Sequence, residues 1–163
     1  MSRLCVFYAL QDAEICKLRE MPPEERYDYM LEEIEPALLG TDAGYEMDKA
    51  WEGVQYCLGG GVWSEENRLP GNVVFGGEFL VDTDEEVMTL KNHADVRRIV
   101  EFLQTHDLAA ILRENYDRIP AQAYSLPKTA EGLEYLIDWS RGLQAFYEKA
   151  MENHCQVIFT VDL

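Results

Sequence analysis

The sequence predicts an α+β fold in a single domain, with a small mixed sheet that includes both terminal strands, several helices packed against it and a long C-terminal helix. Two observations support this prediction. The segments 3–10 (RLCVFYAL) and 155–163 (CQVIFTVDL) are short, apolar and rich in β-formers, whereas helical periodicity dominates between them. The 163 residues, 47% of them hydrophobic, suffice for one core and are too few for two ordinary domains, so we expect one domain over 1–163.

The two terminal segments are apolar on both faces, which is typical of strands inside a sheet, and we expect them to lie side by side. After the first strand, Asp12 is a candidate cap for a short helix that runs to Leu18 or Glu20. A second helix begins at the prolines of PPEERYDYMLEEIEPALLG and is closed by Pro36 and Gly40. Its apolar stripe has the spacing i, i+3, i+4, i+7: Tyr27, Met30, Leu31 and Ile34.

The stretch 46–63 (EMDKAWEGVQYCLGGGVW) predicts a third helix that ends in three consecutive glycines. On a helical wheel its buried stripe comprises Met47, Trp51, Val54 and Leu58. Asp48, Glu52 and Gln55 form a polar row beside that stripe. The row is either the solvated margin of an amphipathic helix, with Gln55 bonded to nearby backbone, or one wall of a ligand pocket with Trp51 as its floor. The glycines follow a helix, so they indicate a C-terminal cap and not a phosphate loop.

The rest of the chain alternates short strands and helices. The segment 72–81 (NVVFGGEFLV) predicts a bent strand or two short strands, interrupted by two glycines, and 87–90 (VMTL) predicts another strand. Asn92 and Asp107 are candidate caps of the next two helices, the second of which extends to about Tyr116, and residues 120–127 are expected to be extended. The last and longest helix has a continuous apolar stripe: Leu133, Leu136, Ile137, Leu143, Tyr147, Ala150 and Met151.

No motif in the chain indicates catalysis, a metal or a cofactor. The four cysteines are far apart in the sequence and lack the paired spacing of a zinc site. The acidic segment 81–87 (VDTDEEV) lacks the spacing of a calcium loop, which favours a solvated turn. The three histidines fall in separate elements, and no serine has the context of a hydrolase nucleophile. We therefore expect no cofactor and no metal.

The charge balance limits the partners. The chain has 31 acidic and 14 basic residues, a net charge of −17, so its surface should repel nucleic acid and anionic membranes. The same charge attracts a basic protein partner, although it is also a common route to solubility. The apolar run of MSRLCVFYAL is too short for a secretory signal, and no stretch is long enough to span a membrane. We expect a cytoplasmic protein with reduced thiols.

Three segments carry a resemblance to a known family: YEMDKAWEGVQYCLGG, VVFGGEFL and GLEYLIDWSRGLQAFYEKAMENHCQVIFTV. Their order resembles the YfbM-like family of small bacterial proteins, a domain of unknown function, over most of the chain. The most specific parts are Met47 to Lys49 followed by Trp51, and the terminal helix with Phe146, Tyr147 and Ala150. The resemblance implies an α+β fold and a cytoplasmic bacterial protein, and brings no catalytic residue. Many relatives carry His where this chain has Gln55, and Thr-Gly where it has Gly59-Gly60.

Two classes of function follow from these observations. The absence of a catalytic signature favours a non-catalytic interaction protein, like an immunity or inhibitor protein, whose acidic surface binds a basic partner. The alternative is a small-molecule-binding protein or enzyme with a pocket near Trp51, Gln55 and Gly76-Gly77. The oligomeric state stays open. The candidate binding residues are Asp48, Trp51, Glu52, Gln55, Gly76, Gly77, Glu78 and Tyr124.

Overall fold

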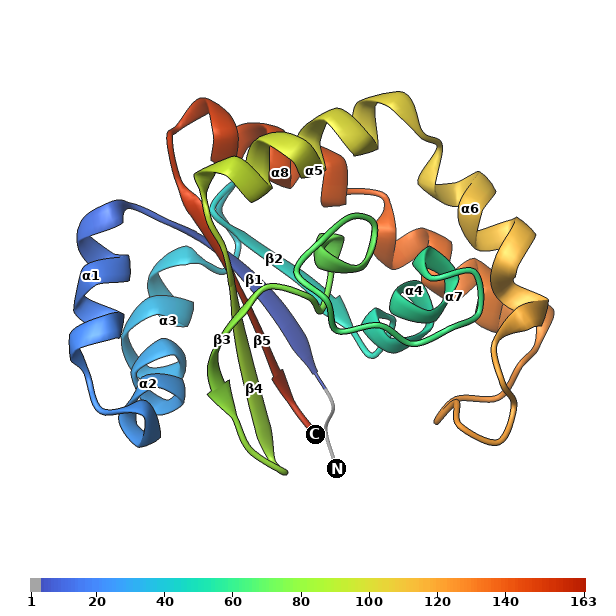
Figure 1. Ribbon diagram of the computed structural model, residues 1–163, viewed down its shortest axis with the longest axis horizontal. Coiled ribbons are helices and arrows are strands. Elements are labelled where there is room, and N and C mark those ends of the chain that lie inside the picture. The colour runs from blue at the N-terminus through green and yellow to red at the C-terminus, as the bar shows by residue number, and fades with distance from the viewer. Residues whose placement is uncertain (1–3) are drawn as a thin grey trace.

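The computed structural model describes residues 4–163 and shows a five-stranded sheet with helices on both faces (Figure 1). The strand order is β2-β1-β5-β4-β3. The strands are β1 (Cys5–Leu10), β2 (Gly44–Asp48), β3 (Glu78–Asp82), β4 (Glu86–Lys91) and β5 (Gln156–Asp162). Every pairing among them is antiparallel, so the sheet is not mixed. The direction of a pairing depends on which strands become neighbours, and the residues of one strand do not specify this.

The two terminal strands lie at the centre of the sheet. β1 pairs with β5 along its whole length, from Cys5 opposite Val161 to Leu10 opposite Gln156, which confirms that they lie side by side. All residues of β1 are buried, and so is most of β5. An unbroken apolar run therefore indicated correctly that these two strands lie inside the sheet.

A small helical layer covers one face of the sheet. It consists of α1 (Asp12–Glu20), α2 (Pro23–Tyr29), a π-helical turn (Met30–Ile34) and α3 (Glu35–Leu38). Its core joins residues of these helices to the sheet: Val6, Tyr8, Leu10, Ile15, Leu18, Met30, Ile34, Leu80, Val81, Met88, Leu90 and Ile158. Gln11, not Asp12, is at the N-cap of α1. The Asp12 carboxylate instead accepts hydrogen bonds from His93 and Gln156 across the sheet end, an arrangement that local sequence cannot specify.

The second predicted helix continues through a π-helical turn. Pro36 lies inside α3 and does not close the helix at residue 36. Because proline has no N–H, it cannot bond the Glu32 carbonyl, and the Glu35 N–H bonds Met30 one residue further back than in an α-helix. Tyr27, Met30 and Ile34 of the predicted stripe are buried, whereas Leu31, also expected in the core, is 43% exposed.

A larger helical layer covers the opposite face. Its helices are α4 (Trp51–Leu58), α5 (His93–Thr105), α6 (Leu108–Asn115), α7 (Ala130–Ser140) and α8 (Leu143–Glu152), with 3₁₀ turns at Gly71–Val73 and Tyr116–Arg118. The predicted caps are confirmed: Asn92 forms a capping box with Asp95, and Asp107 accepts from the Ala110 N–H. The glycines after α4 form a C-terminal cap in which Gly60 bonds Cys57 and Gly61 bonds Tyr56.

Three predicted segments have a different structure. Residues 46–48 belong to β2, so the third helix begins only at Trp51, and Asp48 has a positive φ of 50° between strand and helix. Residues 72–77 cross the core without pairing as a strand. Residues 120–127 form a turn in which the Ala123 and Tyr124 N–H groups bond the Pro120 carbonyl, so they are not extended.

The C-terminal helical stretch extends over 130–152, as predicted, but it is divided into α7 and α8 at Arg141 and Gly142. Tyr45 of β2 enters this break: its hydroxyl donates to the Trp139 carbonyl and accepts from the Gly142 N–H at 3.2 Å. A Cβ at Gly142 would lie 2.7 Å from the Tyr45 ring. A side chain inserted into the backbone ladder is a known cause of helix breaks. Met151, predicted in the stripe, is 37% exposed.

Candidate functional site

The first candidate region is α4, which is buried along its whole length. Glu52 is 7% exposed and Gln55 1%. The interpretation of the polar row as a solvated margin is therefore wrong for these two residues. α4 lies between α6, α7 and the loop that follows it, so no face of the helix is left for solvent. Because the sequence shows only one helix at a time, it could not reveal that neighbours cover the polar flank as well.

The buried amide of Gln55 is fully used in structural hydrogen bonds. Its Nε2 donates to the Ser64 carbonyl at 2.7 Å and to the Gly71 carbonyl at 2.9 Å. Its Oε1 accepts from the Phe75 N–H at 3.0 Å. Gln55 thus fixes the loop that follows α4. Its bonds to backbone groups were expected by the interpretation of the polar row as a helix margin. A hollow of about 260 Å³ adjoins it, lined by Gln55, Gly59, Ser64, Arg68, Leu69, Pro70 and Gly71.

We call residues 71–77 the strap, because this segment crosses the core beside β4 without pairing as a strand. Its buried carbonyl groups need partners. Three side chains from other elements donate to them in sequence order: Tyr147 to Val73, Lys91 to Val74, and Thr89 to Phe75. Together with Gln55, these side chains replace the backbone partners that a neighbouring strand would have supplied.

Lys91 is the most unusual member of this network, because it is fully buried. Its side-chain nitrogen donates to the Val74 carbonyl and, at 2.8 Å, to the Thr89 hydroxyl, and it lies 4.8 Å from the ring centre of Phe159. Burial lowers the pKa of Lys91 well below its ordinary value, and the nearby Cys5 and Asp95 oppose this only in part. Lys91 therefore acts as a buried hydrogen-bond donor, and it does not line any of the hollows described here.

Gly76 and Gly77 allow the strap to pass close to other backbone. A Cβ at Gly76 would lie 2.6 Å from the Glu66 carbonyl oxygen. Gly77 has a φ of +151°, and a Cβ there would lie 2.8 Å from the Leu90 carbonyl oxygen. The two glycines follow a 3₁₀ turn and precede β3, so their role is close packing and not the binding of a phosphate.

The other predicted site residues, Glu78, Tyr124 and Asp48, contact different elements of the fold. Glu78 is exposed and pairs with Arg19 of α1. Tyr124 is buried against α4, where its hydroxyl would lie 2.6 Å from a Cβ at Gly53. The Asp48 carboxylate accepts from the Tyr135 hydroxyl. The predicted set therefore does not converge on one open pocket.

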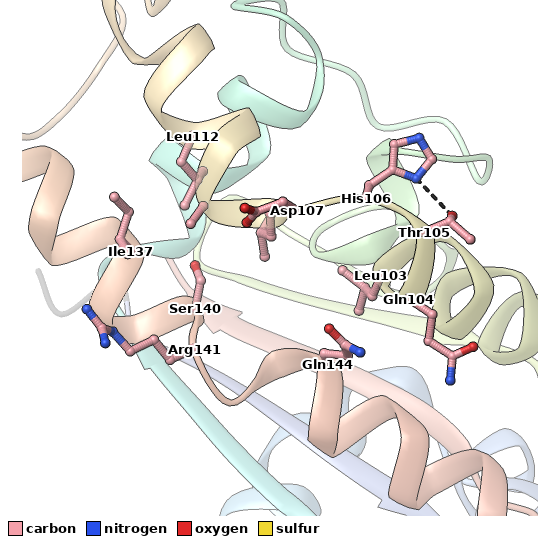
Figure 2. Close-up of a pocket in the computed structure, with 12 residues that line it drawn as sticks. Leu103, Gln104, Thr105, His106, Asp107, Leu112, Ile137, Ser140, Arg141 and Gln144 are labelled. Carbon is pink, nitrogen blue, oxygen red and sulfur yellow. Dashed lines mark hydrogen bonds between the residues drawn. The ribbon is translucent and has the colours of Figure 1, made fainter.

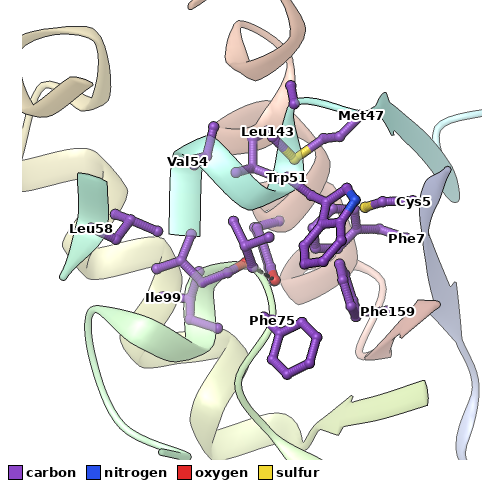
Figure 3. Close-up of a cluster of buried hydrophobic side chains, with 14 of the residues drawn as sticks. Cys5, Phe7, Met47, Trp51, Val54, Leu58, Phe75, Ile99, Leu143 and Phe159 are labelled. Carbon is purple, nitrogen blue, oxygen red and sulfur yellow. Dashed lines mark hydrogen bonds between the residues drawn. The ribbon is translucent and has the colours of Figure 1, made fainter. Parts of the chain in front are cut away.

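Trp51 belongs to the core and is 3% exposed. Figure 3 shows its indole facing Phe75 and Phe159, with β1 residues alongside. The indole stacks on Phe75 with 5.7 Å between ring centres and meets Phe159 edge-on at 6.1 Å. These contacts join α4, the strap and β5 into one apolar cluster.

A groove of about 660 Å³ lies between the start of α2 and the hairpin of β3 and β4. Its floor is partly apolar and its rim is acidic. The lining residues are Pro23, Glu24, Phe79, Leu80, Val81, Asp82, Thr83, Asp84, Glu85 and Glu86. The hairpin acids form a solvated turn, as predicted, and across residues 4–163 no three His, Cys, Asp or Glu side chains are grouped to hold a metal.

A second hollow, of about 450 Å³, lies where two helix interruptions meet (Figure 2). One interruption is the α5–α6 joint at His106 and Asp107, and the other is the α7–α8 joint at Arg141. The lining residues are Leu103, Gln104, Thr105, His106, Asp107, Leu108, Ala109, Leu112, Ile137, Ser140, Arg141 and Gln144. Local sequence patterns could not indicate this hollow, because Tyr45 of a distant strand enters the break between α7 and α8.

A family model described as "Domain of unknown function (DUF1877)" matches residues 1–160. The chain belongs to this family. Among solved structures, it is similar to the protein of unknown function YfbM from Escherichia coli, with a TM-score of 0.65 and 16% sequence identity over 98% of this chain and 99% of that one. The resemblance to the YfbM-like family is therefore confirmed.

Membership of the DUF1877 family establishes the fold and leaves the activity open. No curated protein matches the chain. No helix formed by residues 4–163 is both long and apolar enough to cross a membrane. A function for this DUF1877 member must therefore be argued from its own surface and hollows.

Proposed function

We propose that this protein is a non-catalytic cytoplasmic interaction protein that binds a basic protein partner through an acidic face. That face consists of α2 and the β3–β4 hairpin, on either side of the 660 Å³ groove. The observation that supports it most is the composition of the groove, because five of its ten lining residues are carboxylates. Charge of one sign around a groove with an apolar floor suits the long, basic and partly apolar side chains of a protein partner.

Among residues 4–163, no lysine or arginine forms an ion pair with the five carboxylates that line the groove. Arg26 is the only lysine or arginine between residues 20 and 48, and it points inward: its Nε donates to the Leu18 carbonyl and its Nη1 to the Leu80 carbonyl. Burial, and then the nearby carboxylates of Asp28, Glu85 and Asp162, raise the pKa of Glu86. A basic partner would relieve this repulsion on binding.

A face of this kind acts mainly on the rate of association. Like charges gathered on one side of a protein steer an oppositely charged partner toward that side, and salt screens the effect. We expect the association rate to fall steeply as the ionic strength rises toward roughly 0.5 M, where the Debye length is below about 5 Å.

The experiment compares three baits in affinity purification from the native cell, followed by mass spectrometry. The first bait is the wild type, and the second carries Glu24→Gln, Asp84→Asn and Glu85→Gln in the groove. The third is a control with the same loss of charge on the exposed side of α7: Glu131→Gln, Glu134→Gln and Asp138→Asn. All six side chains are exposed.

We expect the wild type and the control to recover the same basic protein and the groove variant to lose it. The association rate of the recovered complex should depend strongly on salt, whereas its dissociation rate should not. Recovery of only neutral or acidic proteins, or binding that is insensitive to salt, would contradict the proposal.

The alternative is a small-molecule pocket near Trp51, Gln55 and Gly76-Gly77. It has less support, because the Gln55 amide is occupied by three backbone groups and the two glycines are closely packed. The 260 Å³ hollow beside Gln55 is also smaller than the roughly 300–1,000 Å³ of ordinary ligand pockets.

A further inference from the structure

Three polar side chains face the hollow at the two helix joints. Figure 2 shows Asp107 at the start of α6, Ser140 at the end of α7 and Gln144 on α8 directed toward the space between these helices, while Arg141 points away from it. The three residues come from separate helices, and only the interruption of both helical pairs brings them to one place.

Each of these three side chains has an oxygen that can accept a hydrogen bond from a ligand in the hollow. The Ser140 hydroxyl uses its one proton to donate to the Leu136 carbonyl at 2.7 Å. The Gln144 amide nitrogen donates to Glu148 at 2.7 Å, and its oxygen has no donor among residues 4–163. Asp107 caps Ala110 through Oδ1 at 3.3 Å, and its other oxygen likewise receives no bond from the described residues.

The electrostatics also favour a cation. Within residues 4–163 no lysine or arginine forms an ion pair with Asp107, and Arg141 is paired with Asp138 at 3.0 Å. The Asp107 carboxylate stands at the N-terminus of α6 and offsets the positive end of that helix. An anionic group in the hollow would face the Asp107 carboxylate (Figure 2).

The floor of the hollow is apolar. Leu103, Leu112 and Ile137 are buried beneath it, and Leu108 and Ala109 are half-buried at its side. The volume of about 450 Å³ falls within the roughly 300–1,000 Å³ of small-molecule pockets. A ligand that fits must combine an apolar body with a group rich in N–H donors.

We propose that this hollow binds a small primary amine in its protonated form, with an apolar carbon chain. The three N–H donors of the ammonium match the three acceptors, namely the Asp107 carboxylate, the Ser140 hydroxyl oxygen and the Gln144 amide oxygen. The carbon chain lies on Leu103, Leu112 and Ile137. The site is separate from the acidic groove, so neither proposal depends on the other.

The test uses n-butylammonium as the probe and methyl-resolved NMR titration of the full chain at pH 7. We expect saturable shifts at the methyl groups of Leu103, Leu112 and Ile137. Asp107→Asn keeps a good helix cap but removes the charge, so it should weaken binding by about tenfold or more. Ser140→Ala should weaken binding to a smaller extent while leaving the fold intact, because it removes only one neutral acceptor.

Two controls make the result specific. Glu134→Gln removes the same charge from an exposed position on α7 outside this hollow and should bind as the wild type does. Pentanoate, an anion of similar length, should not bind. The proposal is overturned if butylammonium does not shift these methyl groups, if pentanoate binds as well, or if Asp107→Asn binds as tightly as Glu134→Gln.

Discussion

The side chains that bond the strap and those that face the hollow at the helix joints both lie against an apolar core, and they differ in how completely they are paired. In the strap, Gln55 and Lys91 donate to buried carbonyls, and Gln55 also accepts from the backbone. In the hollow, one carboxylate oxygen of Asp107 and the amide oxygen of Gln144 receive no donor from the described residues. The difference teaches that a polar residue on an apolar surface is not evidence of a site until its hydrogen bonds have been counted.

The largest expected effect concerns the packing of the strap against α4. Trp51→Ala removes an indole that is 3% exposed and stacked on Phe75, and should lower the free energy of unfolding by about 3–5 kcal/mol. Urea denaturation measures the change. Val62→Ala, at a position 68% exposed, is the control and should change stability by less than about 0.5 kcal/mol. A small shift of the thermal midpoint for Trp51→Ala would make Trp51 a surface anchor.

Two glutamines test the comparison directly. Gln55→Ala leaves the buried Phe75 N–H and the Gly71 carbonyl without their partner and should cost about 2–3 kcal/mol. Gln144→Ala, in the hollow, loses only a surface contact to Glu148 and should cost less than about 0.5 kcal/mol. Equal losses of stability in denaturant titrations would show that the two regions do not differ as described.

The buried amine of Lys91, which bonds the strap, predicts that the stability of the protein depends on pH. Because the pKa of Lys91 is lowered by folding, the unfolded chain binds its proton below about pH 10.5 while the folded chain does not. This contribution to stability is therefore lost as the pH falls from about 10.5 toward the folded pKa and is constant below it. The thiol of Cys5 acts in the opposite direction above pH 9, because burial raises its pKa.

The measurement compares wild type with Lys91→Met at each pH, which removes the part of the Cys5 contribution that comes from burial, its largest cause, because both proteins share it. The stability of the wild type relative to the variant should rise with pH by up to about 1.4 kcal/mol per pH unit in that window. A difference that is independent of pH between 7 and 9 would show that Lys91 keeps its charge in the folded protein.

The smallest expected effect is that of divalent metals. Calcium, magnesium or zinc should leave the melting temperature unchanged, because the acidic hairpin lacks an ordered ligand set and the cysteines lack paired spacing. Differential scanning fluorimetry with each ion tests this. A rise of several degrees with one ion would contradict it and would assign the groove a ligand other than a protein.

Sequence patterns located most of the helices and strands, because the spacing of apolar residues and the capping of a helix both depend on residues that are close together in the chain. They anticipated the caps at Asn92 and Asp107 and the glycine cap after α4, because each depends on residues within one helical turn. They placed residues 46–48 in a helix because Met47 fits a helical stripe, although it is equally buried in β2. They could not locate the hollow, which depends on the contact of Tyr45 with the α7–α8 break.

By itself, the sequence determined the α+β class, the buried terminal strands, the core position of Trp51 and the excess of acid, because these follow from composition and from periodicity along one element. Only the tertiary structure decided which polar groups are satisfied. The Gln55 amide oxygen is bonded because the strap brings the Phe75 N–H, twenty residues further along the chain, back to α4. One oxygen of Asp107 and the amide oxygen of Gln144 face a hollow instead, because two helix breaks meet there. Hydrogen bonds between distant segments form only after the chain is packed, so no local pattern can report them.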